Sequence, residues 1–257
     1  MTSIQLWNAF YTMMRNDIVR ILRIWSQTLL PPVVTTALYF VVFGTFIGSQ
    51  LAPIHGYKYI QFIVPGLIMM SVITSAYSQV VSTFFFAKWT KVLNEMIVSP
   101  MPDWLIIASY ITGGVLRGLL VAILVLGVSL FFTHLVVYNV VVLVVAIVLT
   151  SIIFSLAGLI NGVFANGFDS VSIVPTFVLT PLTYLGGIFY SIQQFSPFWQ
   201  KVAMLNPILY MVNAFRYGFL GITDINLVTC FGVLIGVMVV FMAVLAYLFR
   251  NGVGFKN

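Results

Sequence analysis

Long apolar stretches without charged residues recur through this chain and constrain its fold more than any other feature. Only 6% of its 257 residues are charged and 61% are hydrophobic, whereas about 25% of residues in a soluble domain are charged. A helix needs about 20 apolar residues to cross a bilayer. Six stretches are long enough, and only the third contains a charged residue, Arg117: 28–48, 60–86, 104–132, 137–163, 171–191 and 225–249. The sequence therefore predicts an all-α integral membrane protein with six transmembrane helices in one domain, 1–257.

The basic residues predict which side of the membrane each loop faces. With a cytoplasmic N-terminus, six spans return the C-terminus to the same side. Seven of the eleven Lys and Arg residues then lie in cytoplasmic segments: Arg15, Arg20, Arg23, Lys88, Lys91, Arg250 and Lys256. Lys58, Lys201 and Arg216 lie outside, and Arg117 lies within the third span. This asymmetry follows the positive-inside rule, so the net charge of +6 reports topology and gives no sign of a nucleic-acid partner.

The N-terminal region before the first span predicts an interfacial helix over 4–25, not a cleavable signal peptide. Apolar residues fall on one face at 100° per residue: Ile4, Trp7, Phe10, Tyr11, Met14, Ile18, Ile21, Leu22 and Trp25. Polar and basic residues occupy the other face, which suits a helix in the cytoplasmic headgroup region. Two interpretations stay open: a plain anchoring helix, and a helix that also contacts a cytoplasmic partner.

The insertion between the second and third spans, 87–104, is the longest polar segment on the cytoplasmic side. Four charged residues fall in it: Lys88, Lys91, Glu95 and Asp103. Four apolar residues form a patch that we expect to be exposed: Leu93, Met96, Ile97 and Val98. Pro100 and Pro102 end the predicted helix. A short charged helix with an apolar patch is typical of a docking surface, and an ordinary solvated loop is the alternative.

Arg117 is the one charge placed deep within a predicted span. An ionisable residue at that depth usually faces a bundle interior or an aqueous cavity. It either bonds to helix carbonyls or belongs to a translocation path or a dimer seam. No acidic residue lies at a comparable depth, which argues against a proton-coupled transporter. The single cysteine, Cys230, excludes an internal disulfide and a cysteine metal cluster, and we expect it to be a small apolar residue of the last span.

The segment 181–221 is too apolar for a solvated loop and too broken by Gly, Pro and polar residues for one span. Irregular backbone beside a bilayer is tolerated only where protein buries it or where it lines a watery cavity. We therefore expect a re-entrant segment here.

Motifs for catalysis are absent from the sequence. There is no H-E-x-x-H and no G-x-S-x-G, and no lysine follows a glycine, so a Walker A motif does not occur. We expect no enzymatic activity, no metal and no cofactor bound by this chain. If the protein pumps, its energy comes from another polypeptide.

Four stretches carry a family resemblance: VPGLIMMSVITSAYS from Val64, NEMIVSP from Asn94, PTFVLTPLTYLGGIFYSI from Pro175 and LNPILYMVNAFRYGFLG from Leu205. With the order of the predicted elements, they resemble the permease subunit of ABC-type-2 exporters, closest to short, drug-exporter-like bacterial members. The resemblance covers essentially the whole chain. It implies a bacterial inner-membrane machine of two permeases and two ATP-binding subunits, with ATP and Mg on those subunits.

The resemblance also implies roles for particular segments. The coupling helix, 88–101, would contact the ATP-binding subunit through Lys88, Lys91, Leu93, Glu95 and Pro100. Spans two and five would line the route. The region 193–221 would form two short helices that gate the exit in the outer leaflet. Pro197, Pro207 and Gly221 would mark its breaks, with Lys201 and Arg216 near the outer headgroups.

Three candidate functions remain under these expectations. The first is export of a small amphipathic or drug-like molecule. The second is export of a polysaccharide or lipid-linked glycan, which we expect to need aromatic rings along the path. A channel or secondary transporter is the alternative of another class, since it needs no ATP-binding subunit.

Overall fold

The computed structural model describes residues 2–134 and 137–252, and this part of the chain is helical with no β-strand. Lys256 and the loop residues 135–136 lie outside the described residues. The elements are α1 (Ser3–Arg23), α2 (Trp25–Thr28), α3 (Leu30–Tyr39), η1 (Phe40–Ile47), α4 (Tyr59–Trp89), α5 (Val92–Val98), α6 (Asp103–Ser129), α7 (Val140–Phe164), α8 (Phe168–Val174), η2 (Pro175–Leu179), α9 (Thr180–Tyr184), η3 (Ile192–Gln194), α10 (Pro197–Met204), α11 (Pro207–Leu220) and α12 (Leu227–Asn251). The elements η1 and η2 are π-helical and η3 is a 3-10 turn.

Five helices in the described residues are long and apolar enough to cross a membrane: Trp25–Ile47, α4, α6, α7 and α12. They match five of the six predicted spans. The predicted span 171–191 takes the form of α8, η2 and α9, which follow one another directly and end at Tyr184. After α9 the chain turns through Gly187, which has a φ of 72°. The six-span count therefore stays a prediction.

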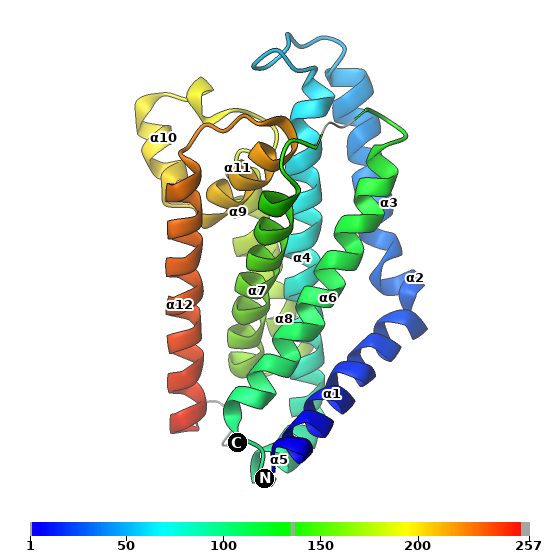
Figure 1. Ribbon diagram of the computed structural model, residues 1–257, viewed down its shortest axis with the longest axis vertical. Helices are drawn as coiled ribbons and strands as arrows, with labels where there is room; N and C mark the ends of the chain where they lie inside the picture. Colours follow the sequence, from blue (N-terminus) through cyan, green and yellow to red (C-terminus); the bar gives the residue numbers. More distant parts are fainter. Residues whose placement is uncertain (1, 135–136, 253–257) are drawn as a thin grey trace.

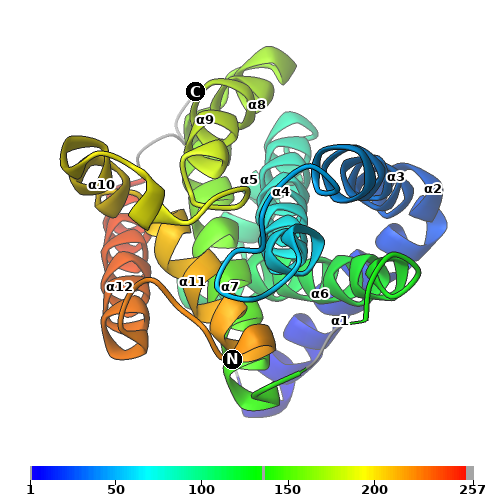
Figure 2. The ribbon, with the colours of Figure 1, turned by 90° about the horizontal axis from the view of Figure 1, so that it is seen from above.

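Helix α4 lies at the centre of the bundle, packed against α6, α7 and α11 (Figure 2). Glycines let the neighbouring backbones approach closely. The space beside Gly114 and Gly118 of α6 is filled by Ser155 and Ser151 of α7. Their four-residue spacing predicts close helix contact, and here that contact lies within the protomer.

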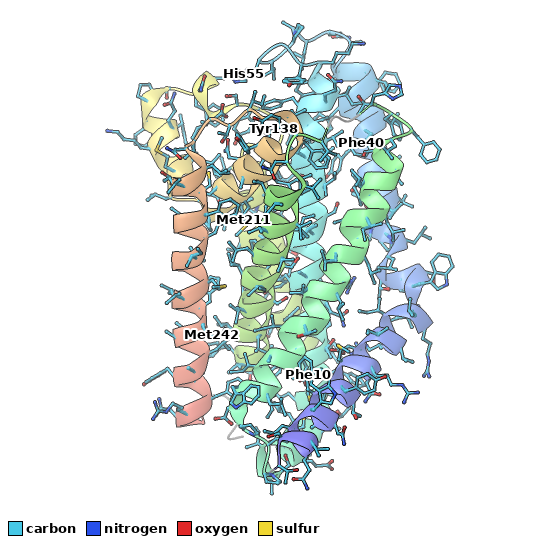
Figure 3. The ribbon with its side chains drawn as sticks, viewed as in Figure 1. Phe10, Phe40, His55, Tyr138, Met211 and Met242 are labelled. Carbon is cyan, nitrogen blue, oxygen red and sulfur yellow. The ribbon has the colours of Figure 1, made fainter. Side chains whose placement is uncertain are left out.

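The bundle has two different ends (Figure 1). The N-terminal part of α1, the helix α5 and the last turn of α12 lie at one end, and α10 and α11 lie at the other. Phe10 and His55 mark these two ends in Figure 3. The predicted docking helix and the predicted exit segment are thus separated by the length of the bundle, as the predicted topology requires.

Candidate functional site

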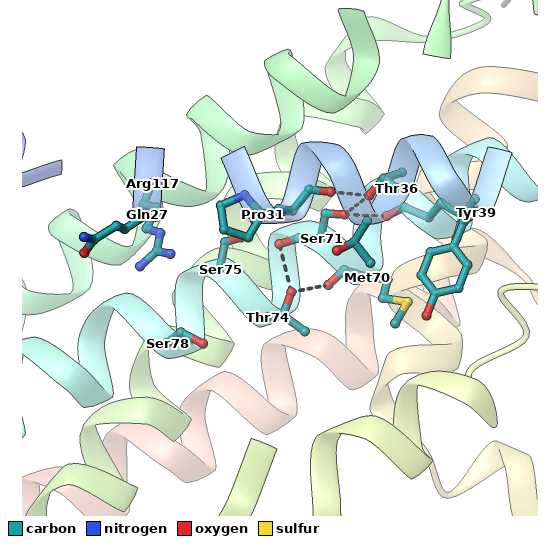
Figure 4. A pocket seen from close by; sticks show the side chains of 13 residues that line it. Gln27, Pro31, Thr36, Tyr39, Met70, Ser71, Thr74, Ser75, Ser78 and Arg117 are labelled. Carbon is teal, nitrogen blue, oxygen red and sulfur yellow. Dashed lines mark hydrogen bonds between the residues drawn. The ribbon is translucent and has the colours of Figure 1, made fainter. Parts of the chain in front are cut away.

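A pocket of about 310 Å³ lies between α2–α3 and α4 (Figure 4). Threonine and serine hydroxyl groups line it: Thr35, Thr36, Ser71, Thr74, Ser75 and Ser78. Four of them belong to α4, where spacings of three and four residues place side chains on one helix face. Pro31, Pro32, Leu67 and Met70 supply its apolar lining. The pocket therefore offers both hydrogen-bonding groups and apolar surface.

Three of these hydroxyls, those of Thr36, Ser71 and Thr74, are bonded to their own helices or to each other. The Thr36 Oγ1 and Ser71 Oγ atoms lie 2.8 Å apart and join α3 to α4, and Ser71 also donates to the Leu67 carbonyl at 3.0 Å. Thr74 donates to the Met70 carbonyl at 2.9 Å. The Ser75 hydroxyl is buried and has no protein partner.

Arg117 of α6 lines the same pocket. Its Nη1 donates to Gln79 Oε1 at 3.2 Å and its Nη2 donates to the Thr28 carbonyl at 3.0 Å, while its Nε is buried without a partner. The ion pair found within 4.0 Å in the described residues joins His55 to Asp224, so Arg117 has no carboxylate partner at that distance. Arg117 thus bonds to a helix carbonyl and faces a pocket at once. Its part in transport stays a prediction.

Aromatic side chains join the last residues of α3 and α9. The hydroxyl groups of Tyr39, which also lines the pocket, and Tyr184 lie 3.2 Å apart. Phe189 stacks on Tyr184 with ring centroids at 5.9 Å and contacts Phe43 at 4.7 Å. Two π-helical segments, η1 and η2, adjoin this cluster, and π-bulges are frequent at functional sites. No sequence signal distinguishes these aromatic residues from others in apolar stretches, so they were not predicted as site residues.

The predicted coupling helix is shorter than expected, since α4 continues to Trp89 and α5 covers only Val92–Val98. Lys88 extends from α4 to the end of α7, where its Nζ donates to the Val163 and Ala165 carbonyls at 2.8 and 3.2 Å. This contact satisfies carbonyls that a helix end leaves open.

The prediction of an exposed apolar patch on this helix is wrong at Leu93. That side chain is only 1% exposed and packs in the cluster with Phe84 of α4. Lys91, Glu95, Val98 and Pro100 are exposed, with Val98 at 87%. Leu93 therefore anchors α5 to the bundle while the opposite face is free for a partner.

The predicted helix over 4–25 is confirmed as an amphipathic helix, α1, over Ser3–Arg23, and its place at the membrane interface stays a prediction. It packs along α6, where the Asp17 carboxylate occupies the space that a side chain at Gly113 would fill. Burial raises the pKa of Asp17 to about 6, and the nearby Arg20 opposes that shift. Trp7 remains 66% exposed, as expected of a helix that faces lipid headgroups.

At the opposite end, the predicted place of Arg216 near the headgroups is wrong. Arg216 is 1% exposed, its guanidinium lies 3.8 Å from the Phe62 ring centroid, and its Nη2 donates to the Gly187 carbonyl at 2.6 Å. A buried cation is retained because the aromatic ring and the carbonyl replace water.

The predicted breaks at this end coincide with helix boundaries. Pro197 and Pro207 begin α10 and α11, where proline is tolerated because the first N–H has no helical partner. Gly221 ends α11 with a φ of 69°. Lys201 is exposed on α10. Two short helices thus occupy the predicted region, and their insertion into the outer leaflet stays a prediction.

Comparison with known proteins identifies the family. The model of the "ABC-2 type transporter" membrane family matches residues 8–220. The chain belongs to the ABC-2 type transporter family. This ABC-2 permease is 54% identical over 251 residues to the inner membrane transport permease YadH of Escherichia coli K12, and equally to those of E. coli O157:H7 and Shigella flexneri. The alignment covers 98% of both chains.

These matches confirm an inner-membrane permease with several membrane-spanning helices. A permease of this family is a component of an ABC transporter, is not itself catalytic and works with an ATP-binding partner.

Proposed function

We propose that this permease exports a small amphipathic molecule from the cytoplasm or inner leaflet, as a homodimer driven by two separate ATP-binding subunits. The observation that carries the proposal is the arrangement of α5, α4 and the pocket. The exposed face of α5 lies at one end of α4, and the hydroxyl-lined pocket lies farther along the same helix.

Packed side chains connect the exposed face of α5 to the helix that lines the pocket. Leu93 of α5 packs in one buried cluster with Val80 and Phe84 of α4 and Leu159 of α7. A displacement of α5 by an ATP-binding subunit is therefore passed to α4 through close-packed side chains, which deform little. Movement of α4 changes the pocket, because Ser71 and Thr74 belong to it.

The chemistry of the pocket supports an amphipathic substrate. It combines a row of hydroxyl groups with the apolar surface of Pro31, Pro32 and Met70. In this account, the aromatic cluster of Tyr39 and Tyr184 closes the route toward the α10–α11 end until the permeases move.

Export of a polysaccharide or lipid-linked glycan is the second candidate. The observation in its favour is the same aromatic cluster, since sugars stack on aromatic faces. The rings of Phe189 and Tyr184 already stack on each other, which argues for closure by the protein's own side chains over a sugar platform.

Reconstitution tests the proposal against a channel or secondary transporter. The permease is purified with its ATP-binding subunit from native membranes and placed in proteoliposomes with an amphipathic fluorescent dye. We expect dye movement only with hydrolysable ATP and magnesium. Equal movement without nucleotide, or movement driven by an ion gradient alone, contradicts the ATP-driven exporter.

A further inference from the structure

The pocket between α2–α3 and α4 holds two buried polar atoms without partners in the protein. They are Ser75 Oγ and Arg117 Nε, and both residues line the pocket. Ser75 is only 2% exposed. Arg117 and Gln27 lie toward one end of the pocket, Ser75 next to them, and Tyr39 at the other end (Figure 4). One end of the pocket thus presents unused hydrogen-bonding capacity beside a cation.

The charge of Arg117 is not neutralised by its neighbours. Its bonded partners, the Gln79 amide oxygen and the Thr28 carbonyl, are both neutral. A guanidinium presents five donors in a planar fork that matches carboxylate, sulfonate and phosphate oxygens. Hydrogen bonds between ionised groups are about twice as strong as neutral ones, and more so away from water. An anionic group is therefore the favoured ligand at this end.

The size and lining of the pocket define the rest of the ligand. A volume of about 310 Å³ is at the lower end of the roughly 300–1,000 Å³ of small-molecule sites. Pro31, Pro32, Leu67 and Met70 extend the lining with apolar surface. This shape suits a compact charged head and the first part of an apolar chain.

We propose that this pocket binds the anionic head of an amphiphile, a carboxylate, sulfonate or phosphate, on Arg117 and Ser75, with its apolar chain along Pro31, Pro32 and Met70. The binding claim stands by itself. The claim that such an amphiphile is the exported substrate rests on the proposed function.

Binding to the full-length permease in phosphatidylcholine nanodiscs, without an ATP-binding subunit, tests the proposal. The probes are dodecyl phosphate, dodecyltrimethylammonium and an uncharged dodecyl polyoxyethylene ether, each below its micelle concentration. We expect dodecyl phosphate to bind at least about tenfold more tightly than the other two. Arg117→Gln should weaken its binding about tenfold to a hundredfold, since a charged hydrogen bond is lost. Ser75→Ala should weaken it less.

Matched controls separate binding from folding. Arg23→Gln removes an exposed cation of α1 and Ser82→Ala removes an exposed hydroxyl of α4, and neither residue lines the pocket. Both should bind dodecyl phosphate as the native protein does. Arg117→Lys keeps the charge and should retain more binding than Arg117→Gln. Equal affinity for the three probes, or unchanged phosphate binding in Arg117→Gln, overturns the proposal.

Two further arms identify the source of the anionic group. If one anionic phospholipid copurifies with each native permease and is lost in Arg117→Gln, the site is supported and its ligand is a bilayer lipid. If the complete transporter moves dodecyl phosphate with ATP, the site is supported and its ligand is a transported substrate. Specific binding without ATP-driven export leaves this inference standing and contradicts only the proposed function. ATP-driven export with phosphate binding unaffected by Arg117→Gln contradicts only this inference.

Discussion

Tyr39 and Tyr184 bring their phenolic oxygens to 3.2 Å and so join the ends of α3 and α9. The two residues are 145 positions apart in the sequence. In each case the α-helix stops at the tyrosine: Tyr39 leads directly into the π-helical segment η1, and Tyr184 is followed by the turn at Gly187. The contact involves no residue of α4, α6 or α7, the helices at the centre of the bundle.

Tyr39→Phe should make this contact easier to open. One hydrogen bond contributes about 0.5–1.5 kcal/mol, so the open population should rise about twofold to tenfold. The measurement is ATP-independent leak of an amphipathic dye from proteoliposomes. Tyr247→Phe, a matched change at an exposed tyrosine of α12, is the control. Equal leak in both variants would show that the tyrosine pair does not close the route.

Leu93→Ala and Val98→Ser should have different effects, because Leu93 lies on the buried face of α5 and Val98 on its exposed face. Truncation of the buried Leu93 creates a cavity and should cost about 2–5 kcal/mol, with lower abundance in the membrane. Val98 is exposed, so Val98→Ser should leave abundance unchanged and weaken copurification of the ATP-binding subunit. Immunoblots and pull-downs measure both effects. Normal abundance of Leu93→Ala would contradict its anchoring role.

Asp17 should make stability depend on pH in an unusual direction. Its pKa is raised from 3.8 to about 6 by burial, against the effect of Arg20, so the folded protein binds this proton more tightly than the unfolded chain. The contribution of the proton is fully present below pH ~4 and is lost as pH rises through ~6, by about 3 kcal/mol.

Asp17→Asn should remove that dependence. We expect the variant to be more stable than the native protein at pH 7.5 and similar to it near pH 4, as measured by thermal unfolding in detergent. The two proteins differ only at position 17, so the difference between them reports Asp17. A difference that does not change with pH would contradict the burial of this carboxyl group.

Arg216→Met should lower the stability of the α10–α11 end. The change removes a buried cation from the Phe62 ring and leaves the Gly187 carbonyl without its donor. We expect a loss of about 3 kcal/mol and a reduced folded yield. Lys201→Met, at an exposed cation of α10, should have no such effect. Comparable yields for the two variants would show that Arg216 is not needed for packing.

The sequence predicts helix positions well where charged residues and the length of an apolar stretch set them. It predicts the surroundings of a side chain poorly where tertiary contacts set them. The ends of α4 and α6 lie within three residues of the expected bounds. Charged residues mark three of these four ends: Lys58, Lys88 and Asp103. Arg216 was misplaced because nothing local shows that Phe62, far away in the chain, covers its guanidinium. Leu93 was misjudged for the same reason, since α4 and α7 bury it.

The pocket and its aromatic neighbours were equally hidden in the sequence. The hydroxyl spacing of Ser71 and Ser75 is visible along α4, yet many apolar helices carry such residues. Only the position of α3 beside α4 turns them into one side of a pocket. Arg117 was identified from its depth alone, while its bonds to Gln79 and Thr28 required the structure.

Site-directed cross-linking tests the central claim that the α5 end meets the ATP-binding subunit. The one native cysteine, Cys230, is buried and can be replaced by alanine, so a single introduced thiol reports its own surroundings. Glu95→Cys on α5 and Lys201→Cys on α10 place exposed thiols at opposite ends. We predict a nucleotide-sensitive cross-link to the ATP-binding subunit from position 95 and none from position 201. Cross-linking from position 201 alone, or from neither, would contradict the account.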